Sequence, residues 1–550
     1  MSNASQLRKR QPHDATDPRD TVANAHLNLH ASPSNADNLV DAVSQSDVVD
    51  DKSPAANDEP KTETNFRKDW LNIVLLIVLY LLQGVPLGLA LGSIPFLLKA
   101  KLSYAQIAVF SLASYPYSLK LFWSPIVDSL YFKSFGRRKT WIVPIQLIIG
   151  SLFLWLGQRV DHYLDDPVPH ITGLTWLFFI IVLLSATQDI AVDGWALTLL
   201  SKENMSYASS CQTIGLTTGY FLSFTVFLAL NSVEFCNAYL RSVPGDQGIL
   251  SLGGYMQFWA SLYFVVTLWL VLFKTEKPDG ENDYGIVQTY RTIWDIIRLP
   301  HMRTLIIIML CAKLGFITNE SVSGLKLLEK GFHKEDLALT VLVDFPFQII
   351  FGYYTAKWSS GNNPLRPWIY AFVGRLLFSL VGMAVVLYCP VGSISATYFV
   401  MVMATTVLSS FMSNVQFVSI SVFMTSIADP AIGGTYMTLL NTISNFGGTW
   451  PKYFILEAVD YFTQSACSVR DKSGTEFSCT DEAGKQQCSA LQGQCVILQD
   501  GYYLVNTACV VLGGIIFVAY IMPNIYRLVR MPTREWHLQE SPAEPVTKED

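Results

Sequence analysis

The sequence predicts an all-α polytopic membrane protein with twelve transmembrane helices in two six-helix halves. Of the 550 residues, 51% are hydrophobic and only 15% are charged, whereas a soluble domain carries about 25% charged residues. Twelve apolar stretches are each long enough to cover a bilayer core, which takes about 20 residues. Several of them contain a charged residue, which hydrocarbon tolerates only beside a partner or a water-filled cavity. We therefore expect a protein that moves something polar across a membrane.

The segment before the first apolar stretch, residues 1–69, is rich in charged and polar residues, and Phe66 is its only aromatic residue. Such a segment cannot bury enough surface to fold, so we predict a disordered cytosolic tail. It has no apolar h-region of a cleavable signal peptide, so the first span is expected to direct insertion. The predicted spans are 71–98, 105–130, 140–158, 172–200, 206–230, 253–274, 303–327, 335–357, 367–389, 395–425, 432–462 and 502–528.

The order of the spans predicts the domain organisation. Shifted by 230 positions, Leu97 and Pro116 fall on Leu327 and Pro346, which indicates an internal duplication of the kind that builds many transporters. The predicted parts are an N-terminal half at 70–274, a cytosolic linker at 275–302, a C-terminal half at 303–528 that includes a lumenal Cys-rich loop at 463–501, and a cytosolic tail at 529–550.

The loop after the second span carries the most specific local pattern, Asp128 followed by Gly136, Arg137, Arg138 and Lys139. Basic residues here and beside the outer spans favour the cytosol, so both termini are predicted to be cytosolic. The loop resembles the signature of the major facilitator superfamily. Asp128 is expected to pair with Arg137 or Arg138 and to hold two helices together in one access state. The alternative is that the basic residues only set topology.

Longer strings at residues 83–88 (QGVPLG), 118–125 (SLKLFWSP), 186–196 (ATQDIAVDGWA) and 429–448 (DPAIGGTYMTLLNTISNFGG) resemble the eukaryotic endoplasmic-reticulum acetyl-coenzyme A transporters. The resemblance implies a twelve-helix carrier in that membrane which brings cytosolic acetyl-CoA to lumenal acetyltransferases. Bacterial muropeptide permeases are more distantly similar, so the resemblance does not decide the identity of the cargo. The alternatives are another bulky anionic metabolite, such as a nucleotide or glutathione disulfide, and a non-transporting membrane scaffold.

Charged residues inside the second and fourth spans are candidates for gating and ion coupling. Lys120 and Asp128 lie on one face of the second span, and Asp189 and Asp193 lie one helical turn apart in the fourth. Two carboxylates that close resist simultaneous ionisation unless a cation lies between them, so either one could carry a proton. The alternative is that one of them pairs with Arg137 or Arg138.

Acetyl-CoA carries a diphosphate and a 3′-phosphate, so its carrier needs cations in the membrane. The main candidates are Lys120, Lys313 and Arg375, and Lys452 is a secondary candidate. The alternative for each is an interhelical ion pair or a side chain that snorkels to the membrane surface. Arg375 is the clearest candidate for snorkelling, because it lies near the start of its span. Glu320 shares a helix face with Lys313 and is a gating candidate. Candidates for stacking or hydrogen bonding to the cargo are Tyr115, Trp195, Tyr220, Trp450, Gln188, Gln212, Asn319, Gln416, Asn441 and Asn445, with packing as the alternative for the aromatic residues.

Cys467, Cys479, Cys488 and Cys495 share the hydrophilic loop before the last span. They predict two disulfides, with three pairings open, in an oxidising lumen or the exterior. A metal site is weaker, because the loop has no Cys-x-x-Cys spacing. The chain has no phosphate-cradling Gly-x-x-x-x-Gly-Lys loop, which argues against an ATP-driven pump. All its histidines are expected in tails or loops, which argues against a membrane-embedded enzyme with a histidine base. No cofactor, metal or nucleic acid is expected. The sequence does not decide whether the protein forms a homodimer, or whether transport is coupled to an ion.

Overall fold

The computed structural model describes residues 66–201, 204, 207–276, 285–332, 334–359, 363–390, 394–428, 433–469, 478–479 and 482–538. The tail predicted for residues 1–69 lies outside the described residues up to residue 65, and residues 66–69 already belong to the first helix. The tail predicted for 529–550 lies outside them from residue 539. Within the described ranges the chain is almost wholly helical with two short strands, so the predicted all-α class is confirmed.

The elements up to residue 273 are α1 (Phe66–Gly88), η2 (Leu89–Ser93), α2 (Ile94–Lys99), α3 (Tyr104–Ser111), η3 (Leu112–Ser114), α4 (Tyr115–Leu119), η4 (Lys120–Phe122), α5 (Ser124–Ser129), α6 (Lys139–Gly157), α7 (Val160–Asp165), α8 (Ile171–Leu199), α9 (Tyr207–Phe221), η6 (Leu222–Val226), α10 (Phe227–Asn231), α11 (Val233–Phe235), η7 (Cys236–Leu240) and α12 (Leu252–Phe273).

The elements after residue 285 are α13 (Ile286–Arg298), α14 (Pro300–Cys311), α15 (Ile317–Glu329), α16 (Lys334–Ser359), α17 (Arg366–Leu387), α18 (Ala396–Ile427), α19 (Gly433–Phe462), β1 (Gln464–Cys467), α20 (Glu482–Ala490), β2 (Cys495–Gln499), α21 (Gly501–Ile516), η9 (Phe517–Ile521), α22 (Met522–Val529) and η10 (Thr533–Trp536).

Nine helices of the described part of the chain are long and apolar enough to cross a membrane, and each matches a predicted span. They make the protein a multi-pass membrane protein. The count of twelve is not confirmed, because the predicted second, seventh and eleventh spans do not qualify. The nine are Lys68–Lys99, Lys139–Gly157, Ile171–Ala196, Ser210–Asn231, Leu252–Phe273, Leu339–Ser359, Arg366–Leu387, Ala396–Ile427 and Gly501–Val529.

The three exceptions have physical reasons. The second span is divided among α3, α4 and α5, because Pro116 and Pro125 each stand in the first turn of a new helix, where a proline needs no N–H partner. The seventh is broken by the turn 312–316 between α14 and α15. The eleventh, α19, is long enough, but it is not apolar enough, because Asn441, Asn445 and Lys452 interrupt its apolar residues.

Residues 63–550 form one compact unit. Within it α1 packs along α9, α6 along α12, and α16 and α17 along α18. Glycines allow α1 and α9 to approach closely. A Cβ on Gly84 would lie 2.4 Å from the backbone oxygen of Leu216, and a Cβ on Gly219 would lie 2.3 Å from the backbone oxygen of Leu81, so neither position has room for a larger residue. The two predicted halves meet where α19 contacts α3 and α4, α15 contacts α2, and α16 contacts η6 and α10.

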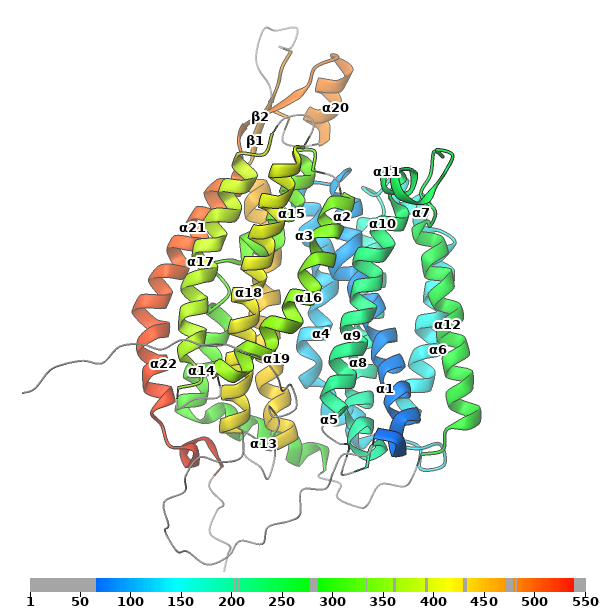
Figure 1. Cartoon of the computed structure of the whole chain (residues 1–550), viewed down its shortest axis with the longest axis vertical. Helices are drawn as coiled ribbons and strands as arrows, with labels where there is room; N and C mark the ends of the chain where they lie inside the picture. The colour runs from blue at the N-terminus through cyan, green and yellow to red at the C-terminus, as the bar shows by residue number, and fades with distance from the viewer. Residues whose placement is uncertain are drawn as a thin grey trace, which may run out of the picture. The chain divides into compact units, whose positions relative to one another are not determined.

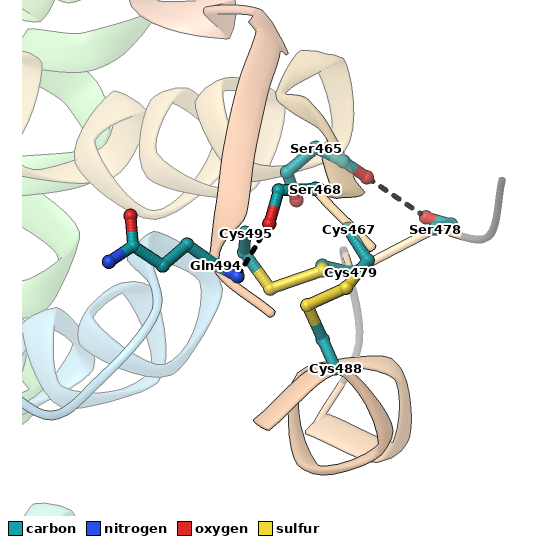
Figure 2. Close-up of a disulfide and its surroundings, with 8 residues drawn as sticks. All are labelled: Ser465, Cys467, Ser468, Ser478, Cys479, Cys488, Gln494 and Cys495. Atoms are coloured by element: carbon teal, nitrogen blue, oxygen red, sulfur yellow. Dashed lines mark hydrogen bonds between the residues drawn. A yellow bond between two sulfur atoms is a disulfide. The ribbon is translucent and has the colours of Figure 1, made fainter. Parts of the chain in front are cut away.

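Two ends of this unit can be told apart in Figure 1, which places β1, β2 and α20 together and α13 opposite them. We call these the disulfide end and the α13 end. At the disulfide end, β1 and β2 pair antiparallel. Cys467 is bonded to Cys488, and Cys479 to Cys495, as Figure 2 shows. This is one of the three pairings that the sequence left open.

Candidate functional site

A cavity of about 930 Å³ lies between α9 and the helices α14 to α19. One wall is formed by hydroxyl and amide side chains of α9, α16 and α18, and another by charged side chains near the break between α14 and α15. Broken helices of this kind mark substrate sites in several transporter folds. The polar and charged lining residues are Ser210, Thr213, Thr217, Thr218, Lys313, Glu320, Gln348, Arg375, Ser410, Ser413, Asn414, Gln416 and Ser444.

Arg375 is the most firmly held of the charged lining residues. Its guanidinium forms an ion pair with Glu320, donates a hydrogen bond to Gln416 and lies 3.6 Å from the ring centre of Phe316. Only 6% of the side chain is exposed, against 36% of Glu320. Arg375 therefore does not snorkel to a membrane surface. It is fixed inside the protein at the cavity wall.

Lys313 stands in the turn that breaks the seventh predicted span. Its ammonium lies so close to α19 that a Cβ on Gly448 would be 2.8 Å from it, so glycine at that position makes room for the lysine. Lys313 is within electrostatic range of Arg375 and of Lys452. Lys452 and Glu320 line a smaller neighbouring cavity. We call Lys313, Arg375 and Lys452 the cationic pole.

The charge of this region is unbalanced. No carboxylate of the described residues lies within ion-pair distance of Lys313 or Lys452, and Glu320 is paired with Arg375. Three buried or half-buried cations thus share a single carboxylate. Uncompensated charge of one sign in a low-dielectric setting is costly, so the arrangement favours a bound anion.

Lys120 lies in a different setting, together with the two carboxylates of the fourth predicted span. Its ammonium is 2.5 Å from Asp189 and 3.6 Å from Asp193. Asp193 also accepts hydrogen bonds of 2.8 Å from Tyr80 and from Gln212. We call Lys120, Asp189 and Asp193 the Lys120 cluster. None of its three members lines the 930 Å³ cavity, so the structure does not bring Lys120 together with the cationic pole.

The loop between α5 and α6 contains the predicted ion pair, made with the second arginine. Arg138 lies 2.6 Å from the carboxylate of Asp128, whereas Arg137 donates a 2.8 Å hydrogen bond to the backbone carbonyl of Asp128. The Arg138 guanidinium also covers α8 at Gly194, where a Cβ would lie 2.3 Å from it. A glycine in the 186–196 string is therefore explained by this contact.

Glu276 is a further residue of this loop that sequence reasoning missed. Its carboxylate accepts hydrogen bonds of 2.9 and 3.1 Å from the backbone N–H groups of Arg138 and Lys139, at the start of α6. Gly136 has a φ of +106° and lies against the same carboxylate. A residue with a side chain would be strained and crowded there. No local pattern near residue 276 signals the contact, which joins positions far apart in the sequence.

Most of the predicted aromatic and amide candidates have structural partners. The Tyr115 hydroxyl donates to the backbone oxygen of Trp450, and the Trp450 indole donates to that of Leu310, at 2.9 and 3.1 Å. Trp195 is 2% exposed in the core. Tyr220 packs against Phe224.

Of the amide residues predicted from the sequence, Gln416 alone is among the residues that line the cavity. Gln188 is fully buried with no hydrogen-bond partner among the described residues, Gln212 binds Asp193, and Asn319 accepts from Ser323. Asn441 and Asn445 are exposed positions of α19 outside the lining.

Apart from Gln416, the sequence reasoning missed the hydroxyl and amide wall on α9, α16 and α18. Its signal was available, since Ser210, Thr213 and Thr217 follow one another at helical spacing in an otherwise apolar span, as do Ser410 and Asn414. Single hydroxyl residues are common in membrane helices, so only their spacing distinguishes them.

A second charged network lies at the disulfide end and joins the two predicted halves. Lys99, at the end of α2, is 3.2 Å from Glu329, at the end of α15. Lys326 lies 2.6 Å from both Glu329 and Asp500, and the Tyr104 hydroxyl donates to Glu329 at 2.9 Å. Burial alone would raise the pKa of Glu329, but Lys99 and Lys326 hold it below its usual value. We call this the Glu329 network.

Comparisons with known proteins identify the family to which this chain belongs. The family model described as Acatn, acetyl-coenzyme A transporter 1, matches residues 72–284, 279–366 and 361–538. An uncharacterized membrane protein of Saccharomyces cerevisiae is 42% identical over 87% of this chain and 99% of its own length. An uncharacterized protein of Schizosaccharomyces pombe is 42% identical over 86% of this chain and 90% of its own.

Among solved structures, a bacterial homolog to the human lysosomal transporter Spinster, in an inward-facing and unoccupied conformation, is 13% identical. It aligns with a TM-score of 0.56 over 88% of this chain and 100% of that chain. At this identity the likeness shows the fold alone, which is the fold of the major facilitator transporters.

Proposed function

Because the chain belongs to the acetyl-coenzyme A transporter 1 family and has the major facilitator fold, it is a membrane transporter, and we propose that its cargo is acetyl-CoA. The direction that we propose is from the cytosol into the lumen of the endoplasmic reticulum, by alternating access. The acetyl group would then supply lumenal acetyltransferases. The carrier itself changes no covalent bond of its cargo.

The observation that carries the proposal is the cationic pole. Acetyl-CoA has a diphosphate and a 3′-phosphate, and Lys313, Arg375 and Lys452 offer three cations against one carboxylate. Hydrogen bonds between charged partners contribute about 1.5–3 kcal/mol each. A cavity of about 930 Å³ is at the large end of the usual range for ligand sites, about 300–1,000 Å³. An anion with several charges and a long uncharged arm fits these features.

The hydroxyl and amide wall supports the same cargo. The pantetheine arm of acetyl-CoA carries two amide groups and an alcohol, which need partners when they leave water. Thr213, Thr217, Ser410 and Asn414 line the cavity on helices other than those that carry the cationic pole. The phosphates and the arm can therefore be bound on separate walls at the same time.

Two ion-paired contacts at opposite ends of the unit support alternating access. The Asp128–Arg138 pair joins α5 to the loop before α6, and the Glu329 network joins α2 to α15 across the predicted halves. We propose that the disulfide end is lumenal, since disulfides persist in oxidising compartments, and that the Glu329 network closes this end while the cavity is open to the other. The termini are then cytosolic.

Uptake of labelled acetyl-CoA by the purified protein in liposomes tests the proposal. We expect saturable uptake that unlabelled CoA inhibits more strongly than ATP or glutathione disulfide, because CoA presents both the phosphates and the arm. Stronger inhibition by ATP or glutathione disulfide would make one of these anions the cargo, which the cationic pole also accommodates. The absence of saturable uptake for all of them would leave a non-transporting scaffold.

A further inference from the structure

Asp344 is a carboxylate in the middle of α16 that the proposed transport mechanism does not use. It is 4% exposed. One oxygen, Oδ2, accepts two hydrogen bonds of 2.7 Å, from the Gln348 amide and from the Ser410 hydroxyl. The other oxygen, Oδ1, is buried and has no hydrogen-bond partner among the described residues. Both donors therefore converge on the same oxygen.

This pattern fits a protonated carboxyl group better than a carboxylate. A neutral carboxyl has one carbonyl oxygen with two lone pairs, which can accept both donors, and one hydroxyl oxygen. An ionised group would leave about half of its negative charge on a buried oxygen without a donor, which is costly. The donors are also uncharged, so they compensate the charge less than a lysine or arginine would.

The elements that pack against α16 bring no cation to Asp344. These are α18, η6, α10 and α17. Neither η6 nor α10 has a titratable residue, and α18 has only Tyr398, which donates to a backbone oxygen. From α17, Arg375 is paired with Glu320, and Arg366 donates to Tyr370. The titratable residues in the sequence of α16 itself stand at least eight positions from Asp344, about 12 Å along the helix backbone; they are Lys334, Glu335, Asp336, Tyr353, Tyr354 and Lys357.

Asp344 thus differs from the other acidic candidates of the chain. Asp189 and Asp193 face Lys120, Asp128 faces Arg138, and Glu320 faces Arg375. Each of these carboxylates has a cation within ion-pair distance. An ionisable group inside the membrane without such a partner is by default a functional site.

We propose that Asp344 is the proton-binding site of this carrier and that its proton moves together with the anionic cargo. The proposal rests on the carrier function proposed above. Gln348 and Ser410, the two partners of Asp344, both line the cavity, so the cargo and the proton share one wall. A protonated Asp344 adds no negative charge beside a bound anion, whereas an ionised one repels it. By linkage, cargo binding then raises the proton affinity of Asp344 to the same extent.

The proton step needs only water. When the site is empty and open to solvent, the carboxyl O–H bond breaks, the proton passes to a water molecule and Asp344 becomes a carboxylate. On the next loading the carboxylate takes a proton from a hydronium ion of the solvent, which becomes water, as the anion binds. The coupled process is proton–anion symport.

Transport measurements on Asp344→Asn test the coupling, because asparagine keeps the size and an acceptor oxygen but cannot exchange a proton. In liposomes at equal pH on both sides, we expect the variant to keep at least half of the wild-type exchange of labelled for unlabelled acetyl-CoA. When the pH outside the liposomes is lower than the pH inside, wild-type uptake should become several-fold faster, whereas the uptake rate of the variant should not change. Asp165→Asn is the matched control, since Asp165 is an exposed carboxylate outside the spans and its variant should keep the gradient response. A variant that responds to the gradient as the wild type does would overturn the proposal.

Infrared difference spectra of the purified protein test the site without any cargo. Acidification should produce the C=O band of a protonated carboxyl that is missing in Asp344→Asn, kept in Asp165→Asn and displaced in Ser410→Ala, which loses one hydrogen bond to Asp344. If no such band depends on Asp344, the proton site is refuted whatever the cargo is. If the band depends on Asp344 but no acetyl-CoA is taken up, the proton site stands and the proposed cargo fails.

Discussion

The Lys120 cluster and the cationic pole both place ionisable side chains inside the membrane helices, but their charge balance is opposite. The Lys120 cluster has one cation between two carboxylates, and Tyr80 and Gln212 donate to Asp193 as well. The cationic pole has three cations and one carboxylate, Glu320, around two neighbouring cavities. The difference teaches that a charged residue within a span indicates a binding site only where the neighbouring charges of opposite sign do not balance it.

The comparison predicts first that Lys120→Ala acts mainly on stability. Removing one partner from a buried ion pair costs about 3–5 kcal/mol, because the remaining charge is left uncompensated. Asp189 is fully buried, so it would bear most of this cost. We expect a clear drop in the midpoint of thermal unfolding in detergent and little change in acetyl-CoA affinity of the protein that remains folded.

A control for this prediction is the triple variant Lys120→Ala with Asp189→Asn and Asp193→Asn, which removes all three charges together. It should recover part of the lost stability. If Lys120→Ala instead keeps its unfolding temperature and loses affinity for acetyl-CoA, Lys120 binds cargo and the distinction between the two regions fails.

The cationic pole predicts a loss of affinity for the cargo. Lys313→Ala and Arg375→Ala should each weaken acetyl-CoA binding by about 1.5–3 kcal/mol, which is about tenfold to a hundredfold in affinity. Equilibrium binding to acetyl-CoA and to acetyl-dephospho-CoA, which lacks the 3′-phosphate, measures the effect and shows which phosphate each cation serves. A cation that serves the 3′-phosphate should lose most of its effect with the shorter ligand.

Arg366→Ala is the matched control, because Arg366 lies on the same helix as Arg375 but outside the cavity lining. This variant should bind both ligands as the wild type does. Unchanged affinity of both Lys313→Ala and Arg375→Ala would remove the cationic pole from the binding site.

The same two regions show what could be read from the sequence. The fold class and the charged residues of each span follow from hydropathy and helical spacing. Pairing between spans does not, since Lys120 and Asp189 are 69 positions apart, and no periodicity in either span states which faces meet. The break at 312–316 that presents Lys313 was likewise not foreseen, because Gly315 is a weak signal until its contact with Gly513 is known.

The loop before α6 gives a smaller, kinetic prediction. Asp128→Asn and Arg138→Gln should lower transport turnover about tenfold, equivalent to about 1.4 kcal/mol, with less effect on binding, because each removes one side of the same ion pair. Arg137→Gln should be milder, since Arg137 donates to the backbone oxygen of residue 128, whereas Arg138 pairs with its carboxylate. Initial rates in liposomes measure this order. An Arg137→Gln variant slower than Arg138→Gln would assign the pairing to the other arginine.

The Glu329 network sharpens the comparison with a case in which charges balance, since Lys99 and Lys326 face Glu329 and Asp500. Such a network should contribute to stability and not to cargo affinity. Glu329→Gln is expected to cost about 1 kcal/mol, the size of a partly exposed ion pair. Because the pKa of Glu329 is lowered in the folded protein, its contribution is present above the usual carboxyl pKa and is lost as the pH falls through the lowered value.

The unfolding midpoint of the wild type should therefore exceed that of Glu329→Gln at neutral pH, and the two should converge in acid. Asp165→Asn, which changes a carboxylate 4.0 Å from Lys101 with 84% of its side chain exposed, should differ little from the wild type at any pH. A Glu329→Gln variant with unchanged stability but faster release of cargo toward the disulfide end would mean that the network acts as a barrier and not as a brace. In that case charges that balance one another would also serve transport. The number of oppositely charged partners would then distinguish residues that bind cargo from residues that gate, but it would not distinguish functional residues from stabilising ones.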